Sequence, residues 1–217
     1  MNYNIVRSKR KNITICINRN AQLVIKAPLK ISSKKIDEFV QKHSDWITKN
    51  MQKVHARLHL YTPYTALENE LVLVLGHQCT IKYTDSNSHT HTDILYLHKS
   101  NNPLQSLISF YKTLANEVVI ERAKRFANSI NIKGAMFKLS SAKTSWGTCN
   151  SSGTIRLGWR LVLLDASLID YVILHELCHL REHNHSKNFW KLVEVYMPDY
   201  KARRQKLKEF SHVPYII

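Results

Sequence analysis

The chain is short of the residues that mark fibrous, low-complexity and membrane-spanning proteins. It holds only five Gly and five Pro among 217 residues, which excludes a collagen-like or low-complexity chain. Its longest aliphatic stretch, residues 71–75, is far below the roughly 20 residues that a membrane-spanning helix requires. With 44% hydrophobic and 22% charged residues, the composition is typical of a soluble protein of one domain, or of two small ones, with a buried core.

Cysteine pairs and an export signal are also missing. The chain begins without the apolar segment and small-residue cleavage site of a signal peptide. Its four cysteines are widely spread and include no C-x-x-C pair, which favours reduced thiols over a disulfide framework. We therefore expect a cytoplasmic protein with no membrane partner, in which four thiols are free: Cys16, Cys79, Cys149 and Cys178.

The hydrophobic pattern predicts an α+β fold in two parts. Residues 1–102 read as an N-terminal β-rich subdomain with one helix, and residues 103–217 as a compact core. In the first part, alternating apolar residues predict a hairpin, and an apolar stripe at helical spacing predicts a helix that packs on it. The elements expected in this part are a hairpin over 13–25, a helix over 32–54 capped by Ser32 or Ser33, and strands over 71–75, 78–83 and 94–98.

The second part is predicted to open with a long helix that ends at the stop signals Asn131 and Gly134. Two strands follow, and the second alternates so that Arg160 lies on its polar face. If that strand borders a cleft, it could bind an extended peptide by strand addition, and Arg160 could steady an oxyanion. The elements expected here are helices over 103–130, 166–180, 186–196 and 199–210, and strands over 135–141 and 154–161.

Residues 175–179 read His-Glu-Leu-Cys-His, an H-E-x-x-H motif on the helix that Asp165 caps. Residues four apart lie about 40° apart around a helix, so His175 and His179 can point at one ion. Glu176 lies beside them, where a carboxylate can take the proton of a water molecule that zinc activates. The sequence predicts a Zn²⁺ site with these two ligands and Glu176 as general base. The alternative is a pair of histidines that only pack in the core or face solvent.

A third protein ligand must follow the motif. His185 comes six residues after His179, the offset at which the metzincin motif returns a histidine to its metal. Metzincins have Gly at the turn where this chain has Glu182, and Asn184, which tolerates a left-handed backbone, could reverse the chain instead. Three ligands leave a position open for water, as in catalytic zinc sites. Cys178 points to another side of the helix and is expected to pack. The candidates for the third ligand are His185, which we favour, and Glu194, His183 and Glu182.

Further motifs stand in order along the chain: Arg7-Ser8-Lys9-Arg10-Lys11, Ala27-Pro28, Asp45-Trp46-Ile47, Trp146-Gly147-Thr148-Cys149, Trp159-Arg160-Leu161, residues 170–180, and Asn184-His185-Ser186 with Phe189-Trp190. In this ordered set the chain resembles the YgjP-like metallopeptidase family, a relative of SprT-type and WLM-type zinc peptidases, over nearly its whole length. The resemblance implies a zincin-like core after the β-rich part, zinc on His175, His179 and His185, and Glu176 as general base.

The resemblance leaves the substrate open, because a nucleoside-triphosphate pyrophosphatase activity has also been attached to the family. Ser145 and Gly158 stand where many relatives carry Arg and Asn, which changes contacts in the cleft but leaves the catalytic set intact. The chain has no G-x-x-x-x-G-K-[ST] phosphate loop, which counts against nucleotide hydrolysis. We therefore place peptide-bond hydrolysis first and a metal-dependent pyrophosphatase acting on UTP second.

Acidic residues are few: 16 Asp and Glu stand against 32 Lys and Arg, a formal charge of +16. Such a surface can bind phosphate backbones without reading bases, or it can simply keep the protein soluble. A basic module that binds nucleic acid without catalysis is thus the third hypothesis, with nucleic acid as a possible partner beside a protein or peptide substrate. The predicted last helix is especially basic, through Lys201, Arg203, Arg204, Lys206 and Lys208.

Overall fold

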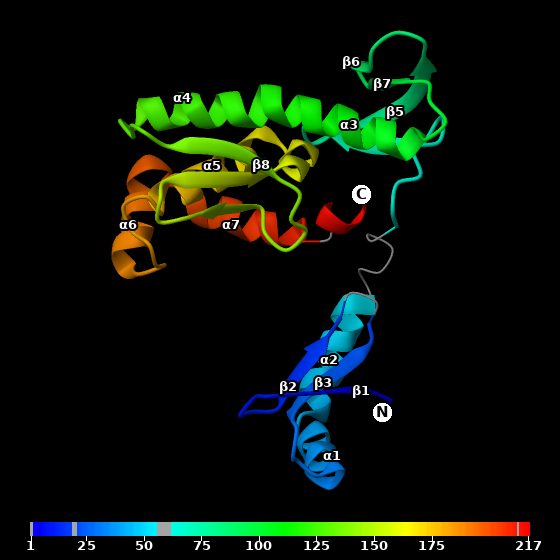
Figure 1. Ribbon diagram of the computed structural model, residues 1–217, viewed down its shortest axis with the longest axis vertical. Coiled ribbons are helices and arrows are strands. Elements are labelled where there is room, and N and C mark those ends of the chain that lie inside the picture. The colour runs from blue at the N-terminus through cyan, green and yellow to red at the C-terminus, as the bar shows by residue number, and fades with distance from the viewer. Residues whose placement is uncertain (1, 19–20, 56–61, 212) are drawn as a thin grey trace. The chain divides into compact units, whose positions relative to one another are not determined.

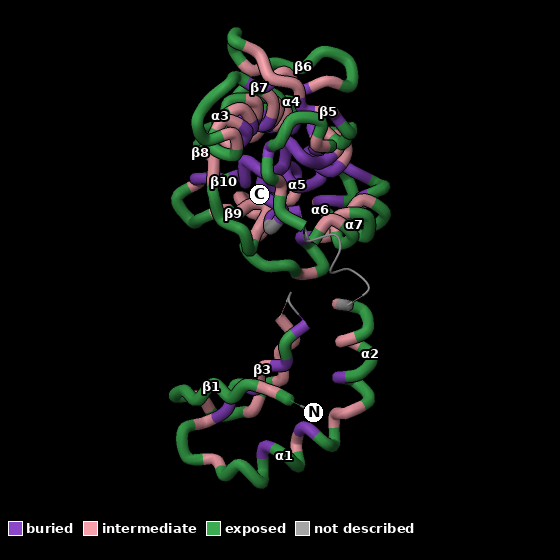
Figure 2. The backbone as a smooth tube through the Cα atoms, turned by 90° about the vertical axis from the view of Figure 1, so that its right-hand side faces the viewer, coloured by how far each residue is buried: buried purple, intermediate pink, exposed green. Residues whose placement is uncertain are grey.

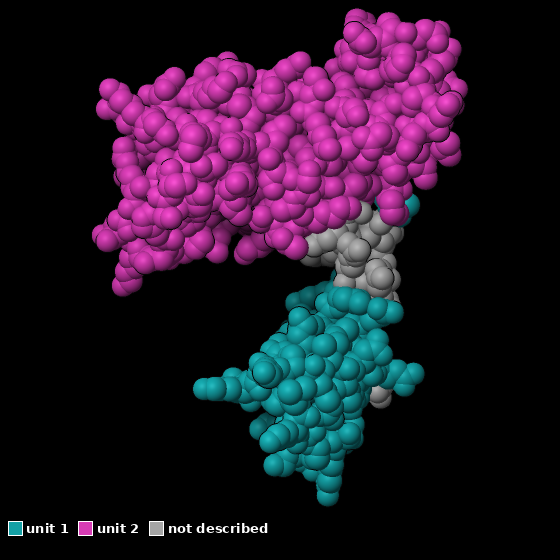
Figure 3. Space-filling model, in the orientation of Figure 1, with its two compact units in different colours: residues 1–62 teal, residues 63–217 magenta. Residues whose placement is uncertain are grey.

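The computed structural model describes residues 2–18, 21–55, 62–211 and 213–217. The chain forms two compact units, unit 1 (Met1–Thr62) and unit 2 (Pro63–Ile217) (Figure 1, Figure 3). Its secondary structure is mixed, so the α+β class is confirmed. The boundary expected between residues 102 and 103 falls inside unit 2, because the strands before residue 102 share one hydrophobic core with the helices that follow.

Unit 1 is a three-stranded sheet packed against two helices. The order of its strands is β1-β3-β2, with β2 antiparallel and β1 parallel to β3. Strands β2 and β3 confirm the expected hairpin, and the apolar faces of the helices and of β3 share one core, as expected. The elements are β1 (Asn4–Ser8), β2 (Thr14–Ile17), β3 (Leu23–Pro28), α1 (Ser33–Lys42) and α2 (Ser44–His55).

The single helix expected over residues 32–54 is in fact two helices. The side chain of Ser32 caps α1, as predicted, but α1 ends at Lys42, because the next residue, His43, has a φ of −109° and a ψ of 17°, outside the helical range. Ser44 and Asp45 then begin α2, and both residue types favour helix N-termini. The apolar stripe runs through both helices, so its periodicity does not reveal the break.

Unit 2 begins with a four-stranded sheet in the order β4-β5-β7-β6. Leu75, just after β4, donates its amide proton to the carbonyl of Val162 at 2.6 Å. Gly76 lies directly against Asp165, where a Cβ would come within 2.8 Å of the Asp165 Cα. These contacts fasten the sheet to the second half of the chain. Its strands are β4 (Leu71–Val74), β5 (His77–Thr84), β6 (His89–His91), which was not expected, and β7 (Ile94–His98).

One long helical segment runs along one side of unit 2 (Figure 1). It consists of α3 (Pro103–Ala115), a π-helical turn (Asn116–Ile120) and α4 (Glu121–Ser129). This confirms the helix expected over residues 103–130. Asn131 follows its C-cap, Ile130, with a φ of 57°, the left-handed backbone that ends many helices, and Gly134, farther along, has a φ of 77°.

A second sheet of unit 2 has the order β8-β10-β9 and consists of β8 (Met136–Ser140), β9 (Gly147–Cys149) and β10 (Thr154–Gly158). Strand β10 is parallel to β8 and antiparallel to β9. The prediction that a peptide could add to this strand is therefore wrong, because β10 is paired on both sides. The expected strand over 154–161 ends at Gly158 and continues as a 3-10 helix (Trp159–Leu163).

The oxyanion role considered for Arg160 is also wrong. Arg160 lies in the 3-10 helix rather than on a strand and is only 6% exposed. Its Nε and Nη2 donate to the backbone oxygen of Ile217 at 3.0 and 2.9 Å, and its Nη1 donates to that of Ser141 at 3.1 Å. The guanidinium therefore holds the segment around Ile217 against the core.

The three remaining helices of unit 2 are α5 (Ala166–Cys178), α6 (Lys187–Tyr196) and α7 (Tyr200–Glu209), close to the expected bounds. A short 3-10 helix (Val213–Tyr215) follows α7. Buried residues, purple in Figure 2, gather in the interior of unit 2, with α5 among them. None of the described helices is both long and apolar enough to cross a bilayer.

Candidate metal centre

Helix α5 carries the first four residues of the motif, which include His175 and Glu176. Asp165 caps the helix, accepting hydrogen bonds from the amides of Ser167 and Leu168 at 3.0 and 3.2 Å. Because α5 is apolar on almost every side, neighbouring elements cover it nearly all round. A two-point ion pair between Arg122 of α4 and Asp170 of α5, with Nη2 and Oδ2 2.8 Å apart, further fixes the helix. The motif is thus built on a rigid support.

His179 is the residue at which α5 ends, and the chain then turns back toward it. The His179 Nδ1 donates to the backbone carbonyl of Glu182 at 3.0 Å, which leaves the lone pair on Nε2. Asn184 does not have the positive φ that we considered for it; its side chain instead accepts a hydrogen bond from the Ser186 amide at 3.1 Å. The reversal is therefore made by local hydrogen bonds, and it returns His185 to the end of α5.

The structure brings His175, His179 and His185 together. One ring nitrogen of each lies within 4.8 Å of the others, and the Nε2 atoms of His175 and His185 are 2.9 Å apart. Nitrogens bound at 2.0–2.1 Å to one tetrahedral ion are about 3.4 Å apart, so small movements would fit the three rings to such an ion. Phe189 of α6 packs against all three rings, with centroids 5.0, 4.5 and 4.8 Å away.

The surroundings of His175 and His185 favour the neutral form of their rings. Burial, with the neighbouring rings of His179 and His185 and the charge of Arg204, lowers the pKa of His175 to about 3. Burial likewise lowers the pKa of His185. The Nδ1 of His175 is buried and has no hydrogen-bond partner among the described residues. Neutral imidazoles keep the lone pairs that bind a metal ion, so the donor set fits a cation.

Glu176 is 6% exposed, and burial raises the pKa of its carboxyl to about 7. Gly147, the first residue of β9, lies against this carboxyl: a Cβ there would come within 2.7 Å of its Cγ and 2.9 Å of its Oε1. The carboxyl thus lies between α5 and β9, one residue along the chain from His175. A buried carboxyl with a pKa near neutrality can exchange protons at physiological pH.

The other candidate ligands lie elsewhere. The Glu194 carboxylate pairs with Lys201 at 3.4 Å, and His183 lines a separate cavity beside residues 131–135. Glu182 reaches His179 through its backbone carbonyl. Cys178 is 1% exposed and lies in the hydrophobic core, as expected. Among the described residues, the three histidines form the one group of three or more His, Cys, Asp and Glu side chains close enough to share an ion.

A cavity of about 320 Å³ adjoins His175 and Glu176. Tyr171 and Arg204 also line it, and neither was predicted from the sequence as a residue of the site. Tyr171 precedes His175 by four residues, so helical spacing could have placed it on the same face. Burial raises the pKa of Tyr171 to about 12, which keeps its hydroxyl protonated. Arg204 comes from α7, and no local pattern connects it with the motif.

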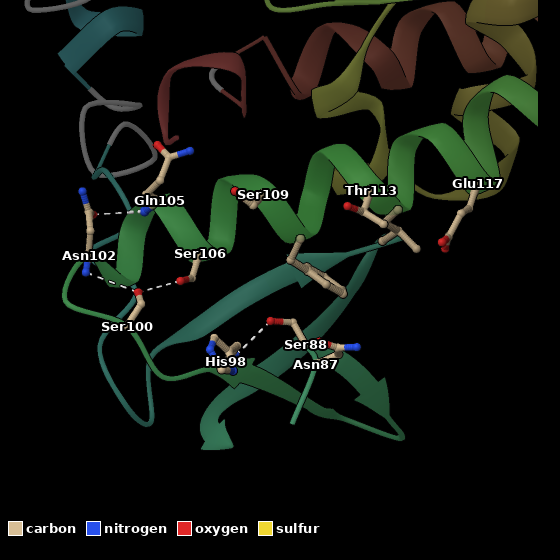
Figure 4. A pocket seen from close by; sticks show the side chains of 12 residues that line it. Asn87, Ser88, His98, Ser100, Asn102, Gln105, Ser106, Ser109, Thr113 and Glu117 are labelled. Atoms are coloured by element: carbon tan, nitrogen blue, oxygen red, sulfur yellow. Dashed lines mark hydrogen bonds between the residues drawn. The ribbon is translucent and has the colours of Figure 1, made fainter. Parts of the chain in front are cut away.

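A larger cavity, of about 690 Å³, lies between α3 and the segment around β6 and β7 (Figure 4). Its lining is mostly Ser, Asn and other uncharged polar side chains, with Glu117 the one carboxylate. It shares no residue with the histidine cluster and has no group of metal-ligating side chains. The chemistry of the molecule therefore centres on the end of α5.

Residues 11–210 match the YgjP-like metallopeptidase domain. The match covers most of the chain, which belongs to the YgjP-like metallopeptidase family, as the sequence motifs indicated.

Among solved structures, the chain is similar to one described as the crystal structure of the metallopeptidase zymogen of Pyrococcus abyssi abylysin. The two share 23% sequence identity over 42% of this chain and 91% of that one, with a TM-score of 0.38. No curated protein matches the chain significantly.

Proposed function

We propose that this protein is a zinc-dependent peptidase, with His175, His179 and His185 as the metal ligands and Glu176 as the general base. Family membership supports hydrolysis of peptide bonds by a metal-dependent enzyme. The observation that carries the proposal is the convergence of three imidazoles at the end of α5, next to a buried carboxyl. Three histidines without a thiolate suit zinc in a catalytic site.

A zinc ion held by these histidines would supply Lewis acidity, which would polarise a substrate carbonyl and lower the pKa of a water molecule to about 7. Glu176 accepts the proton of the attacking water and then gives it to the nitrogen of the leaving amine. Gly147 and the surrounding apolar core keep the Glu176 carboxyl in place and poorly hydrated. The Tyr171 hydroxyl, in the adjoining cavity, can donate a hydrogen bond to an oxygen that becomes negative during the attack.

The peptide substrate would lie in the cavity between β9, α5 and α7. Strand β9 is at the edge of its sheet, and Trp146 and Gly147 at its start line the cavity together with Glu176. An extended peptide could add to the outer edge of β9 rather than to the strand over residues 154–161 that was considered from the sequence. In that position the scissile bond would pass in front of the three histidines.

The proposal is tested by incubating the purified protein with an unfolded protein and with a peptide library, and identifying fragments by mass spectrometry. We expect zinc-dependent cleavage that falls by at least about 100-fold in Glu176→Gln. The matched control is Glu182→Gln, which alters a glutamate of the adjoining loop that contacts His179 only through its backbone. Intact substrates throughout, or equal cleavage by Glu176→Gln, would contradict the proposal. Release of pyrophosphate from UTP that depends on Glu176 would favour the second hypothesis instead.

A further inference from the structure

We propose that a basic groove between α6 and α7 binds acidic side chains of the peptide substrate. The inference rests on the proposed function, and it names the substrate class of the same site. The groove has a volume of about 550 Å³ and adjoins the catalytic cavity. We define the basic groove by Lys187, Trp190, Lys191, Tyr200, Arg204 and Lys208.

The charge of the basic groove is almost entirely positive. Four of its residues are cationic, and the same space is also lined by Lys201 and by a single carboxylate, that of Glu194. Lys201 already pairs with this carboxylate at 3.4 Å. The other four cations, those of Lys187, Lys191, Arg204 and Lys208, form no ion pair with the described part of the chain. Cations crowded into a concave surface favour an anionic ligand that neutralises them.

Arg204 is oriented by an aromatic stack. Its guanidinium lies over the ring of Trp190, 4.6 Å from the ring centroid, and Trp190 in turn stacks on Tyr200 with centroids 5.5 Å apart. This contact fixes the plane of the guanidinium and leaves its edge available. A fixed guanidinium edge binds a carboxylate through two parallel hydrogen bonds.

The basic groove continues into the catalytic cavity. Arg204 and Lys208 line both spaces, and Trp190 also stacks on His185 with ring centroids 5.6 Å apart. A peptide whose scissile bond lies at the histidines would therefore pass over these cations on one side of the bond. The cations are placed to select Asp or Glu near the bond that is cut.

Single-stranded nucleic acid fits the basic groove less well. Proteins that bind it stack bases on free aromatic faces. Here the ring of Trp190 already stacks on Tyr200 and His185 and carries the guanidinium of Arg204. The carboxylates of a peptide need no such platform, so the observations favour an acidic peptide.

The first test measures binding alone, with the Glu176→Gln protein loaded with zinc. A fluorescent peptide rich in Glu is compared with the same peptide carrying Gln, by fluorescence anisotropy at low salt. We expect the acidic peptide to bind at least tenfold more tightly, and added salt to reduce this difference. Most of this difference in affinity should be lost in the double variant Lys187→Glu with Lys191→Glu, and separately in Arg204→Gln. The matched control is Lys112→Glu with Lys138→Glu, the same charge change on α3 and β8, away from the basic groove.

Equal affinity for the two peptides, or an equal loss in the control variant, would overturn the proposal. It would also be overturned if the groove substitutions weakened binding to a DNA duplex and left the acidic peptide bound as before. Cleavage of both peptides by the protein with Glu176 intact separates the two claims. Equal cleavage of both peptides that depends on Glu176 would contradict the role of the basic groove and support the peptidase activity. Selective binding of the acidic peptide without any cleavage would contradict the peptidase activity and support the role of the basic groove.

Discussion

Gly147 lies directly against the carboxyl group of Glu176. A methyl group on Gly147 would come within 2.7 Å of the Glu176 Cγ and 2.9 Å of its Oε1, closer than atoms can approach. The contact joins β9 to α5 and fixes the carboxyl of Glu176, the residue that follows His175 in the chain. It also gives the Trp146-Gly147-Thr148-Cys149 stretch a physical role, since only glycine leaves room for the carboxyl at this point.

Gly147→Ala is expected to displace the Glu176 carboxyl and to lower kcat by about 100-fold, because small misplacements of a reacting group have effects of this size. Peptide cleavage at saturating substrate measures the effect, and zinc content should stay at the level of the unsubstituted protein. The matched control is Gly134→Ala, whose added methyl meets no atom within 4 Å. Its φ of +77° gives it a strain of about 1–2 kcal/mol without any contact with Glu176. Equal loss of kcat in both variants would show that stability alone explains the effect.

Phe189 is fully buried and packs against the rings of all three histidines. Phe189→Leu should reduce the free energy of unfolding by about 1–2 kcal/mol, because it leaves a small cavity. The same cavity loosens the orientation of the rings, and we expect the affinity for zinc to fall about tenfold, as for other losses of support around metal ligands. Competition with a chromogenic chelator measures the affinity. Phe126→Leu on α4 is the control, and it should lower stability while leaving zinc affinity unchanged.

Asp165 makes the start of α5 sensitive to acid. Burial alone would raise its pKa, but hydrogen bonds from Lys206, Ser167 and the Leu168 amide lower it from 3.8 to about 2. A lowered pKa in the folded state means that the stabilisation is present above about pH 4 and is lost as the pH falls toward 2.

Asp165→Asn keeps an N-cap acceptor and removes the charge that pairs with Lys206. At pH 7 we expect it to lower the free energy of unfolding by about 1 kcal/mol, a small value because the carboxylate is partly exposed to solvent. The difference from the unsubstituted protein should vanish between pH 4 and pH 2, as urea unfolding at several pH values would reveal. A difference that stays constant over this range would contradict the assignment.

The sequence predicted the elements that depend on residues close together in the chain. The apolar periodicity around Asp165 and His175 predicted α5, and the distance of six residues from His179 to His185 predicted which histidine returns to the helix end. The cap at Ser32 and the stop signals after α4 could likewise be predicted, because each depends on the conformational preference of one or two residues.

The features that it did not predict depend on distant contacts. The turn after α5 is an exception, because the left-handed conformation considered for Asn184 is absent and a local hydrogen bond from His179 to the Glu182 carbonyl closes the loop instead. Arg160 lies on no strand, since the chain turns into a 3-10 helix and buries its guanidinium. The place of Arg204 near the histidines follows from the packing of α7, which no local pattern encodes.

X-ray absorption at the zinc edge of the purified protein tests the central claim most directly. The account predicts one zinc ion per chain with three imidazole nitrogens and one further light atom at about 2.0–2.1 Å, and with no sulfur at about 2.3 Å. In His185→Ala one imidazole should disappear from the spectrum, whereas in Glu194→Ala the spectrum should stay the same. A sulfur ligand, or three imidazoles that remain in His185→Ala, would contradict the account.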